Sequence, residues 1–280
     1  MSLNVFLLVI LAAFLHSIWN GMVKNFEDKV ISVAAIIFGH VPLAIIVMLF
    51  LPLPTLKSVP YILLSAIIHQ GYQYYLISAY KFGDLTKVYP IARGTGPIIV
   101  TLISIMFLSV LISKFQILSI GLICFGIIIL GLLNKDSLKN KKAIFYSLAT
   151  GLFIGLYSLT DGYGARISLS PLSFIGWSFV LNAMIFPFTL KLMNYSNVFS
   201  RVLKEAKLIF WLGGSLSYIV YGIVVWCFTK APIPLVSALR ESSILFSILI
   251  GVFFLKERMT FIKAGSILII FVGISFLKFF

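Results

Sequence analysis

The sequence has few charged residues and few groups able to form a disulfide or hold a metal. Only 11% of its 280 residues are charged, against about 25% in a typical soluble domain. The two cysteines and three histidines are far apart, so neither a disulfide scaffold nor a metal-ligand motif is expected. Instead, 61% of the residues are apolar, too many for a soluble enzyme or a disordered chain. This composition predicts a polytopic membrane protein.

Long apolar runs, broken by short polar clusters, predict the membrane-spanning segments. A spanning helix needs about 20 apolar residues and a connection about 2–8, so the chain accommodates roughly ten spans and no extramembranous domain. The runs are continuous and longer than the about ten-residue alternating strands of a membrane barrel, so the predicted fold class is an all-α membrane protein. The ten predicted transmembrane helices are at approximately residues 3–23, 31–51, 60–80, 86–108, 114–133, 142–162, 170–190, 208–229, 234–255 and 261–279.

Basic residues are concentrated in alternate loops. A net charge of +14 would indicate nucleic acid as a partner of a soluble protein, but Lys and Arg also gather in the cytoplasmic loops of membrane proteins. Loops after odd-numbered spans hold 15 basic residues and the opposite side holds 5. We therefore expect no nucleic-acid partner, odd-numbered loops in the cytoplasm, and both termini on the extracytoplasmic side.

The two halves of the chain show a weak internal repeat. An offset of 147 residues places Arg93 on Arg240, and an offset of 141 aligns residues 16–21 with 157–162. Two halves of five spans each follow, and because five is odd they have opposite orientations. Inverted repeats are typical of secondary transporters, whose solute site lies near the midplane between the halves.

The repeat therefore divides one integral membrane unit into two parts. Residues 1–137 form the first predicted repeat and residues 138–280 the second. The expected architecture is a 5+5 inverted-topology repeat of ten transmembrane helices.

Polar side chains within the predicted spans are candidates for a solute site. An ionisable group at this depth costs about 2.5–3.5 kcal/mol on insertion scales and persists where it faces a cavity or a partner. Arg93 and Arg240 are candidate anchors for a carboxylate, phosphate or phosphonate. Alternatively, Arg240 pairs with an acid such as Glu241 or Asp161 and only stabilises the bundle. The predicted substrate-binding residues are His16, Trp19, Asn20, His69, Gln70, Gln73, Arg93, Tyr157, Asp161, Tyr221, Arg240 and Glu241.

Aromatic residues accompany these polar groups. A cavity lined by aromatics and an acid can hold an amine through cation–π contact, although Trp and Tyr also form the aromatic belts at membrane interfaces. For Trp19 and Tyr157 we favour the cavity. His16 and His69 are candidates for proton relay, with a satisfied core histidine as the alternative for each.

No enzyme signature accompanies the candidate site. Gly94-Thr95-Gly96-Pro97 lies inside an apolar run and lacks the Gly-Lys-Ser/Thr of a phosphate-binding loop. We therefore expect no enzymatic activity, no cofactor and no metal. The expected partners are a small-molecule substrate and the lipid bilayer. Gly151 and Gly155 fit a Gly-x-x-x-Gly contact, either internal or at a dimer face, so monomer and homodimer both remain open.

Three strings resemble those of EamA-type ten-helix transporters of the drug/metabolite transporter superfamily. They are His16-Ser17-Ile18-Trp19-Asn20, Tyr89-Pro90-Ile91-Ala92-Arg93-Gly94-Thr95-Gly96-Pro97, and Ala238-Leu239-Arg240-Glu241-Ser242-Ser243 followed by Phe254-Leu255-Lys256-Glu257-Arg258. The resemblance implies a 5+5 inverted repeat in the bacterial inner membrane and a central cavity lined mainly by spans 1, 3, 4, 6, 8 and 9. One departure is that Ser109-Val110 stand where many members carry an acid.

The residues and the resemblance together predict a secondary transporter. We expect it to move a small polar organic metabolite, zwitterionic or anionic and similar to an amino acid or aminophosphonate, across the inner membrane by alternating access. The alternative is an exporter of amines or lipophilic cations, in which Glu241 and the aromatics bind the solute while both arginines are structural.

Overall fold

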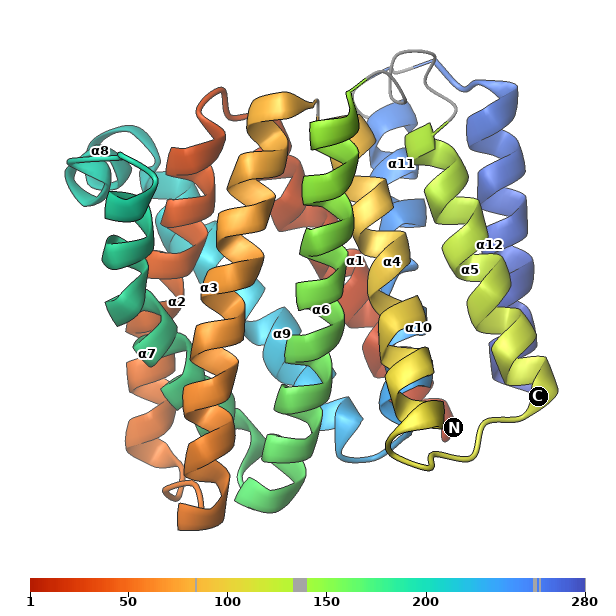
Figure 1. The fold of residues 1–280 in the computed structure, drawn as a ribbon, viewed down its shortest axis with the longest axis horizontal. Coiled ribbons are helices and arrows are strands. Elements are labelled where there is room, and N and C mark those ends of the chain that lie inside the picture. Colours follow the sequence, from red (N-terminus) through yellow and green to blue (C-terminus); the bar gives the residue numbers. More distant parts are fainter. Residues whose placement is uncertain (84, 133–139, 254–255, 257, 280) are drawn as a thin grey trace.

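The structure is a computed structural model that describes residues 1–83, 85–132, 140–253, 256 and 258–279, without the side chains of residues 85–87. The predicted boundary between the two repeats, at residues 137 and 138, and part of the string Phe254-Leu255-Lys256-Glu257-Arg258 lie outside this range. Throughout the described part every regular element is a helix (Figure 1). The long ones are α1 (Leu3–Asn25), α2 (Lys29–Phe50), α3 (Val59–Phe82), α4 (Leu85–Met106), α5 (Lys114–Leu132), α6 (Lys141–Ser168), α7 (Pro171–Leu192), α9 (Gly214–Phe228) and α12 (Phe261–Phe279).

Nine segments of the described chain are long and apolar enough to cross a bilayer. The third predicted span, residues 60–80, is not among these nine but is helical in α3, whose 24 residues extend about 36 Å at 1.5 Å per residue. This helix is absent from the nine because it carries His69, Gln70 and Gln73 together with several tyrosines. The chain is therefore an all-α, multi-pass membrane protein.

The sixth predicted span is longer in the structure than the sequence analysis expected. We placed its end near Gly162, whereas α6 continues to Ser168 and stops where Leu169 adopts a left-handed conformation before Pro171. Gly162 permits close packing instead of ending the helix, because a Cβ there would lie 2.5 Å from Ile233 Cδ1.

The ninth predicted span is interrupted. It consists of α10 (Ile233–Arg240) and α11 (Ser243–Phe253). Between them the amides of Glu241 and Ser242 donate to carbonyls three residues back, at 3.1 and 3.0 Å, so the regular i−4 ladder is broken here. Arg240 is therefore the last residue of α10, and Glu241 lies in the break itself.

A short helix, α8 (Val198–Glu205), lies outside the spans and was not predicted. Its Arg201 guanidinium lies 2.9 Å from carboxylate oxygens of both Asp28 and Glu205. This contact ties α8 to the start of α2. The hydrogen bonds from Arg201 also hold the pKa of the exposed Glu205 carboxyl below its ordinary value.

The connections alternate between two faces of the helical bundle. In Figure 1 both chain ends lie towards the lower edge, with the α2–α3, α6–α7 and α9–α10 connections. The α1–α2 and α7–α8 connections and the C-terminal end of α3 lie towards the upper edge. The face that carries both chain ends is called the terminal face below, and the other is called the opposite face.

Glycines bring α6 and α4 into close contact. A Cβ on Gly151 would lie 2.5 Å from Thr95 Cβ, and one on Gly155 would lie 2.6 Å from Ile99 Cγ2. The Gly-x-x-x-Gly pair of the sequence analysis therefore packs inside the protein. This contact fixes Tyr157 on α6 relative to Arg93 on α4.

Candidate substrate-binding cavity

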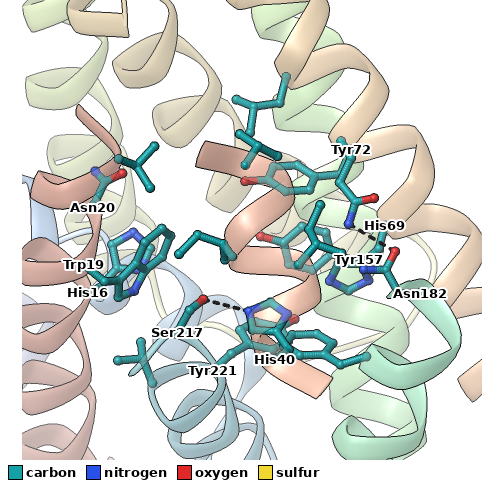
Figure 2. Close-up of a pocket in the computed structure, with 18 of the residues that line it drawn as sticks. His16, Trp19, Asn20, His40, His69, Tyr72, Tyr157, Asn182, Ser217 and Tyr221 are labelled. Atoms are coloured by element: carbon teal, nitrogen blue, oxygen red, sulfur yellow. Dashed lines mark hydrogen bonds between the residues drawn. The ribbon is translucent and has the colours of Figure 1, made fainter. Parts of the chain in front are cut away.

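A cavity of about 120 Å³ opens among the helices. Its walls come from α1, α2, α3, α4, α6, α7, α9 and α10, which adds α2 and α7 to the helices implied by the resemblance. In Figure 2 side chains of α1 lie across the cavity from those of α3, α6 and α7. Nine of the predicted binding residues line it: His16, Trp19, Asn20, His69, Gln73, Arg93, Tyr157, Tyr221 and Arg240.

The two arginines and Glu241 form a buried charge cluster beside the cavity. Arg93 Nε lies 2.7 Å from Glu241 Oε2, whereas Arg240 Nε lies 3.6 Å from Glu241 Oε1. Arg93 also donates from Nη2 to Ser243 Oγ at 3.0 Å. Glu241 is fully buried and does not itself line the cavity. The cluster therefore holds two positive charges and one negative charge, and Glu241 pairs mainly with Arg93.

Arg240 is the less neutralised of the two arginines. Its side chain lines the cavity and is only 2% exposed. Within the described residues, its Nη2 atom has no hydrogen-bond partner. A buried donor left unpaired costs free energy, so this atom is disposed to bind an acceptor that enters the cavity.

Local sequence positions both arginines. Pro97, in the middle of α4, has no N–H to bond the carbonyl of Arg93 four residues earlier. Arg240 is the last residue of α10, immediately before the helix break. Irregular backbone at membrane depth is tolerated where a cavity or a neighbour satisfies it, so both features fit a solute site.

Asp161 lies just behind the cavity wall, in contact with two residues that line it. Tyr221 donates to Asp161 Oδ2 at 2.6 Å, and His69 Nε2 lies 4.0 Å from the same oxygen. The other oxygen, Oδ1, has no hydrogen-bond partner in the part of the chain described. Asp161 is fully buried, so its protonation state matters to the charge of the cavity wall.

Aromatic rings form much of the remaining wall (Figure 2). The His69 ring stacks on Tyr157 with centroids 4.4 Å apart, and Phe179 stacks on Tyr221 at 5.5 Å. Tyr72 meets Tyr157 edge-on at 5.5 Å. Stacked and edge-on pairs of this kind are rigid and present both faces and edges of rings to a solute.

Opposite this wall, α1 contributes His16, Trp19 and Asn20. His16 Nε2 is hydrogen-bonded to Tyr89 Oη at 2.9 Å, and its ring packs edge-on against Trp19. The Trp19 indole N–H has no partner among the described residues. Together with Asn20 it provides polar groups on the side of the cavity away from Asp161.

Gln70 and Gln73 have different positions, although they are neighbours on α3. Gln70 donates to the backbone carbonyl and side chain of Asn182 and accepts from Thr189 at 2.5 Å. It thus ties α3 to α7 and does not line the cavity. Gln73 lines the cavity and donates to Asn182 Oδ1 at 3.1 Å, with its own carbonyl oxygen unpartnered among the described residues.

Several lining residues were not among the predicted set. His40 and Asn182 are polar groups at membrane depth, the same signal that identified His16 and Asn20. Ser217, the hydrogen-bond partner of His40 at 3.1 Å, has no such signal because serine is common in membrane helices. The aromatics Tyr72 and Phe179 are indistinguishable in sequence from packing residues.

Comparison with known proteins gives the family. Residues 141–279 match the sequence profile described as the EamA-like transporter family. The chain belongs to this family of the drug/metabolite transporter superfamily and is a membrane transporter, as its three strings led us to expect.

Solved structures support the same fold. A crystal structure described only as that of a protein superposes with a TM-score of 0.72 at 13% sequence identity. The alignment covers 99% of this chain and 96% of that one. In all, 28 chains of solved structures match, and no curated protein does.

Proposed function

We propose that the chain is a secondary transporter of a small polar organic metabolite that carries an anionic group. A zwitterion or anion resembling an amino acid or an aminophosphonate fits best. The solute crosses the inner membrane by alternating access through the cavity described above.

The observation that carries this proposal is the charge of the Arg93–Arg240–Glu241 cluster. Glu241 compensates one arginine, and Arg93 is the nearer by about 0.9 Å (2.7 against 3.6 Å). Arg240 therefore offers an uncompensated charge and a free donor to the cavity. A carboxylate or phosphonate supplies both the countercharge and the acceptor.

A cation exporter is the second candidate, and it rests on a different part of the wall. The rings of Tyr157 and Tyr221, which meet edge-on near Asp161, suit an ammonium group through cation–π contact and charge. A zwitterion contacts both parts of the cavity wall, with its anionic group at Arg240 and its ammonium group near Asp161. A lipophilic cation alone leaves Arg240 uncompensated, so we favour the zwitterion.

Helix packing supports a 5+5 inverted repeat, with residues 1–137 and 138–280 as the halves and α3 as the third of ten spans. Under that assignment the most extensive interhelical contacts have counterparts with the halves exchanged. The pair α3–α6 corresponds to α9–α1, α3–α7 to α9–α2, and α4–α6 to α10 and α11 with α1. The pairs α2–α7 and α5–α12 are their own counterparts and are also in contact.

Contacts on the terminal face support alternating access. Arg166, near the end of α6, donates to the Phe228 carbonyl at 2.9 and 2.8 Å and to the Ala231 carbonyl at 3.0 Å. These bonds join α6 to the α9–α10 connection. The cavity itself extends towards the opposite face, along Val23, Val33 and Tyr80. The Arg166 hydrogen bonds therefore form a barrier between the cavity and the terminal face. We propose that this barrier must open for solute to leave or enter on the terminal face.

The charge distribution supports an orientation. The 15 basic residues assigned to the odd-numbered loops favour the opposite face as cytoplasmic. Both termini then lie outside the cytoplasm. Reporter tags placed at each terminus and in the α7–α8 connection test this orientation by their accessibility in intact cells.

Thermal unfolding of the purified protein with a panel of solutes tests the proposed substrate class. The panel contains amino acids, aminophosphonates, quaternary amines and lipophilic cations. A solute that binds only the folded protein raises its melting temperature. Stabilisation by amino acids or aminophosphonates, lost in Arg240→Gln, is the expected result. Stabilisation by cations alone, lost in Asp161→Asn but not in Arg240→Gln, replaces our proposal with the exporter.

A further inference from the structure

The tautomer of His69 follows from its hydrogen bonds. Its Nδ1 atom lies 2.9 Å from the backbone carbonyl of Ser65, one turn earlier on α3. A carbonyl oxygen only accepts hydrogen bonds, so Nδ1 carries a proton. In the neutral ring the other nitrogen, Nε2, is then a bare acceptor. That nitrogen is the atom that faces Asp161 at 4.0 Å.

Asp161 has too few donors to be a stable bare carboxylate. Tyr221 donates to Oδ2, the Ser65 hydroxyl is the other donor near the carboxylate, and Oδ1 has no partner of hydrogen-bond geometry among the described residues. A buried carboxylate without a paired cation is strongly disfavoured at membrane depth. Two bare acceptors, Asp161 Oδ2 and His69 Nε2, therefore face one another unless a proton resides on one of them.

Other titratable or charged groups surround this pair on several helices. The rings of Tyr72, Tyr157 and Tyr221 lie against His69. The groups that act on the pair through space are His40 on α2, Arg240 on α10 and, through Arg240, Glu241 and Arg93 of α4. On α7 the nearby lining residues, Phe179 and Asn182, are uncharged. Asp161 is the carboxylate nearest to His69 in the described chain, and no arginine contacts it.

We propose that His69 and Asp161 form a proton-binding site in the cavity wall. One exchangeable proton resides either on Nε2, giving an ion pair, or on the carboxyl group, giving a neutral pair. It is taken from and returned to water in the cavity, which His69 lines directly. No other group changes its bonding, so the step balances as proton transfer alone.

The site gives the transporter a means of coupling to a proton gradient. Loss of the proton leaves one negative charge in the wall, and its gain removes that charge. A solute ammonium near Tyr221 therefore competes with the proton. This coupling rests on the transport function proposed above, whereas proton binding itself requires no solute.

Infrared difference spectroscopy of the full-length protein in detergent tests proton binding without any ligand. Spectra are recorded in steps over the pH range in which circular dichroism shows the protein to be folded. The expected result is a carboxyl band that titrates in the wild type, disappears in Asp161→Asn and persists in the surface control Glu205→Gln. In His69→Gln the midpoint moves to lower pH by about one unit or more, a tenfold loss of proton affinity, because only one of the two proton acceptors remains.

Nitrogen NMR of histidine-labelled wild-type protein gives a second reading that needs no variant at Asp161. His69 Nδ1 stays protonated at every pH, while Nε2 changes over the same pH interval as the carboxyl band; His69→Gln assigns the signal. A carboxyl band that survives in Asp161→Asn, a midpoint unmoved in His69→Gln, or an Nε2 that never titrates overturns the proposal.

Discussion

Replacing Arg240 with glutamine removes the uncompensated charge of the cavity and leaves the main ion pair of Glu241 intact. That pair is the 2.7 Å contact with Arg93. A charge-assisted hydrogen bond contributes about 1.5–3 kcal/mol, which corresponds to a loss of roughly 10- to 150-fold in affinity for an anionic group. Because Arg240 is the more distant partner of Glu241, at 3.6 Å, the variant should fold normally.

Thermal unfolding measures both the folding of the Arg240→Gln variant and its loss of affinity for the solute. At a solute concentration 100 times its dissociation constant, wild-type protein gains about 2.7 kcal/mol of stability. A hundredfold weaker affinity reduces that gain to about 0.4 kcal/mol at the same concentration. We therefore expect Arg240→Gln to unfold at the wild-type temperature without solute and to lose nearly all stabilisation by an amino acid or aminophosphonate.

Arg93→Gln is the matched comparison, since it changes the same residue type in the same cluster. It leaves Glu241 with only its distant partner, and removing one member of a buried ion pair costs about 3–5 kcal/mol. Its melting temperature should therefore fall even without solute. If Arg240→Gln binds the solute as tightly as the wild type does, the reasoning about the uncompensated charge is refuted.

Three further predictions concern the packing, the barrier and the surface. Gly151→Ala should lower stability by about 1–3 kcal/mol in thermal unfolding through overpacking, because its Cβ would clash with α4, whereas Gly121→Ala, with open space around it, should not; equal effects contradict the packing account. Arg166→Gln should speed maleimide labelling of Cys227, now fully buried beside the barrier, by severalfold, and an unchanged rate argues against a barrier role. Arg201 lowers the pKa of Glu205, so the small contribution of this pair to folding stability is present above the ordinary carboxyl pKa and is lost as pH falls through the lowered value. Because the pair is exposed, Glu205→Gln should leave the melting temperature at neutral pH unchanged within error. A large drop in melting temperature contradicts this.

Much of the architecture could be predicted from the sequence because a bilayer imposes length and apolarity on every span. Nine predicted spans satisfy both criteria in the structure, and α3 is helical although polar. The break between α10 and α11 was missed because Glu241-Ser242 contains neither proline nor glycine. The extent of α6 was missed because a span was placed by apolarity and length alone, whereas α6 continues to Ser168 and Gly162 packs against Ile233.

The candidate site was partly visible because charges at membrane depth need a reason to persist. That signal identified Arg93, Arg240 and Asp161. It could not assign partners: the sequence analysis considered an ion pair between Arg240 and Glu241, whereas Arg93 is the nearer partner of Glu241. Pairing depends on how helices distant in sequence pack together, which spacing along one helix does not encode.

Counterflow in proteoliposomes tests the central claim most directly. Vesicles containing the protein are loaded with an unlabelled amino acid or aminophosphonate from the thermal panel and given the labelled form outside. The account predicts rapid uptake of label by the wild type, strong loss in Arg240→Gln, and retention in the surface variant Glu205→Gln. Exchange confined to lipophilic cations, or equal exchange by Arg240→Gln and the wild type, would contradict it.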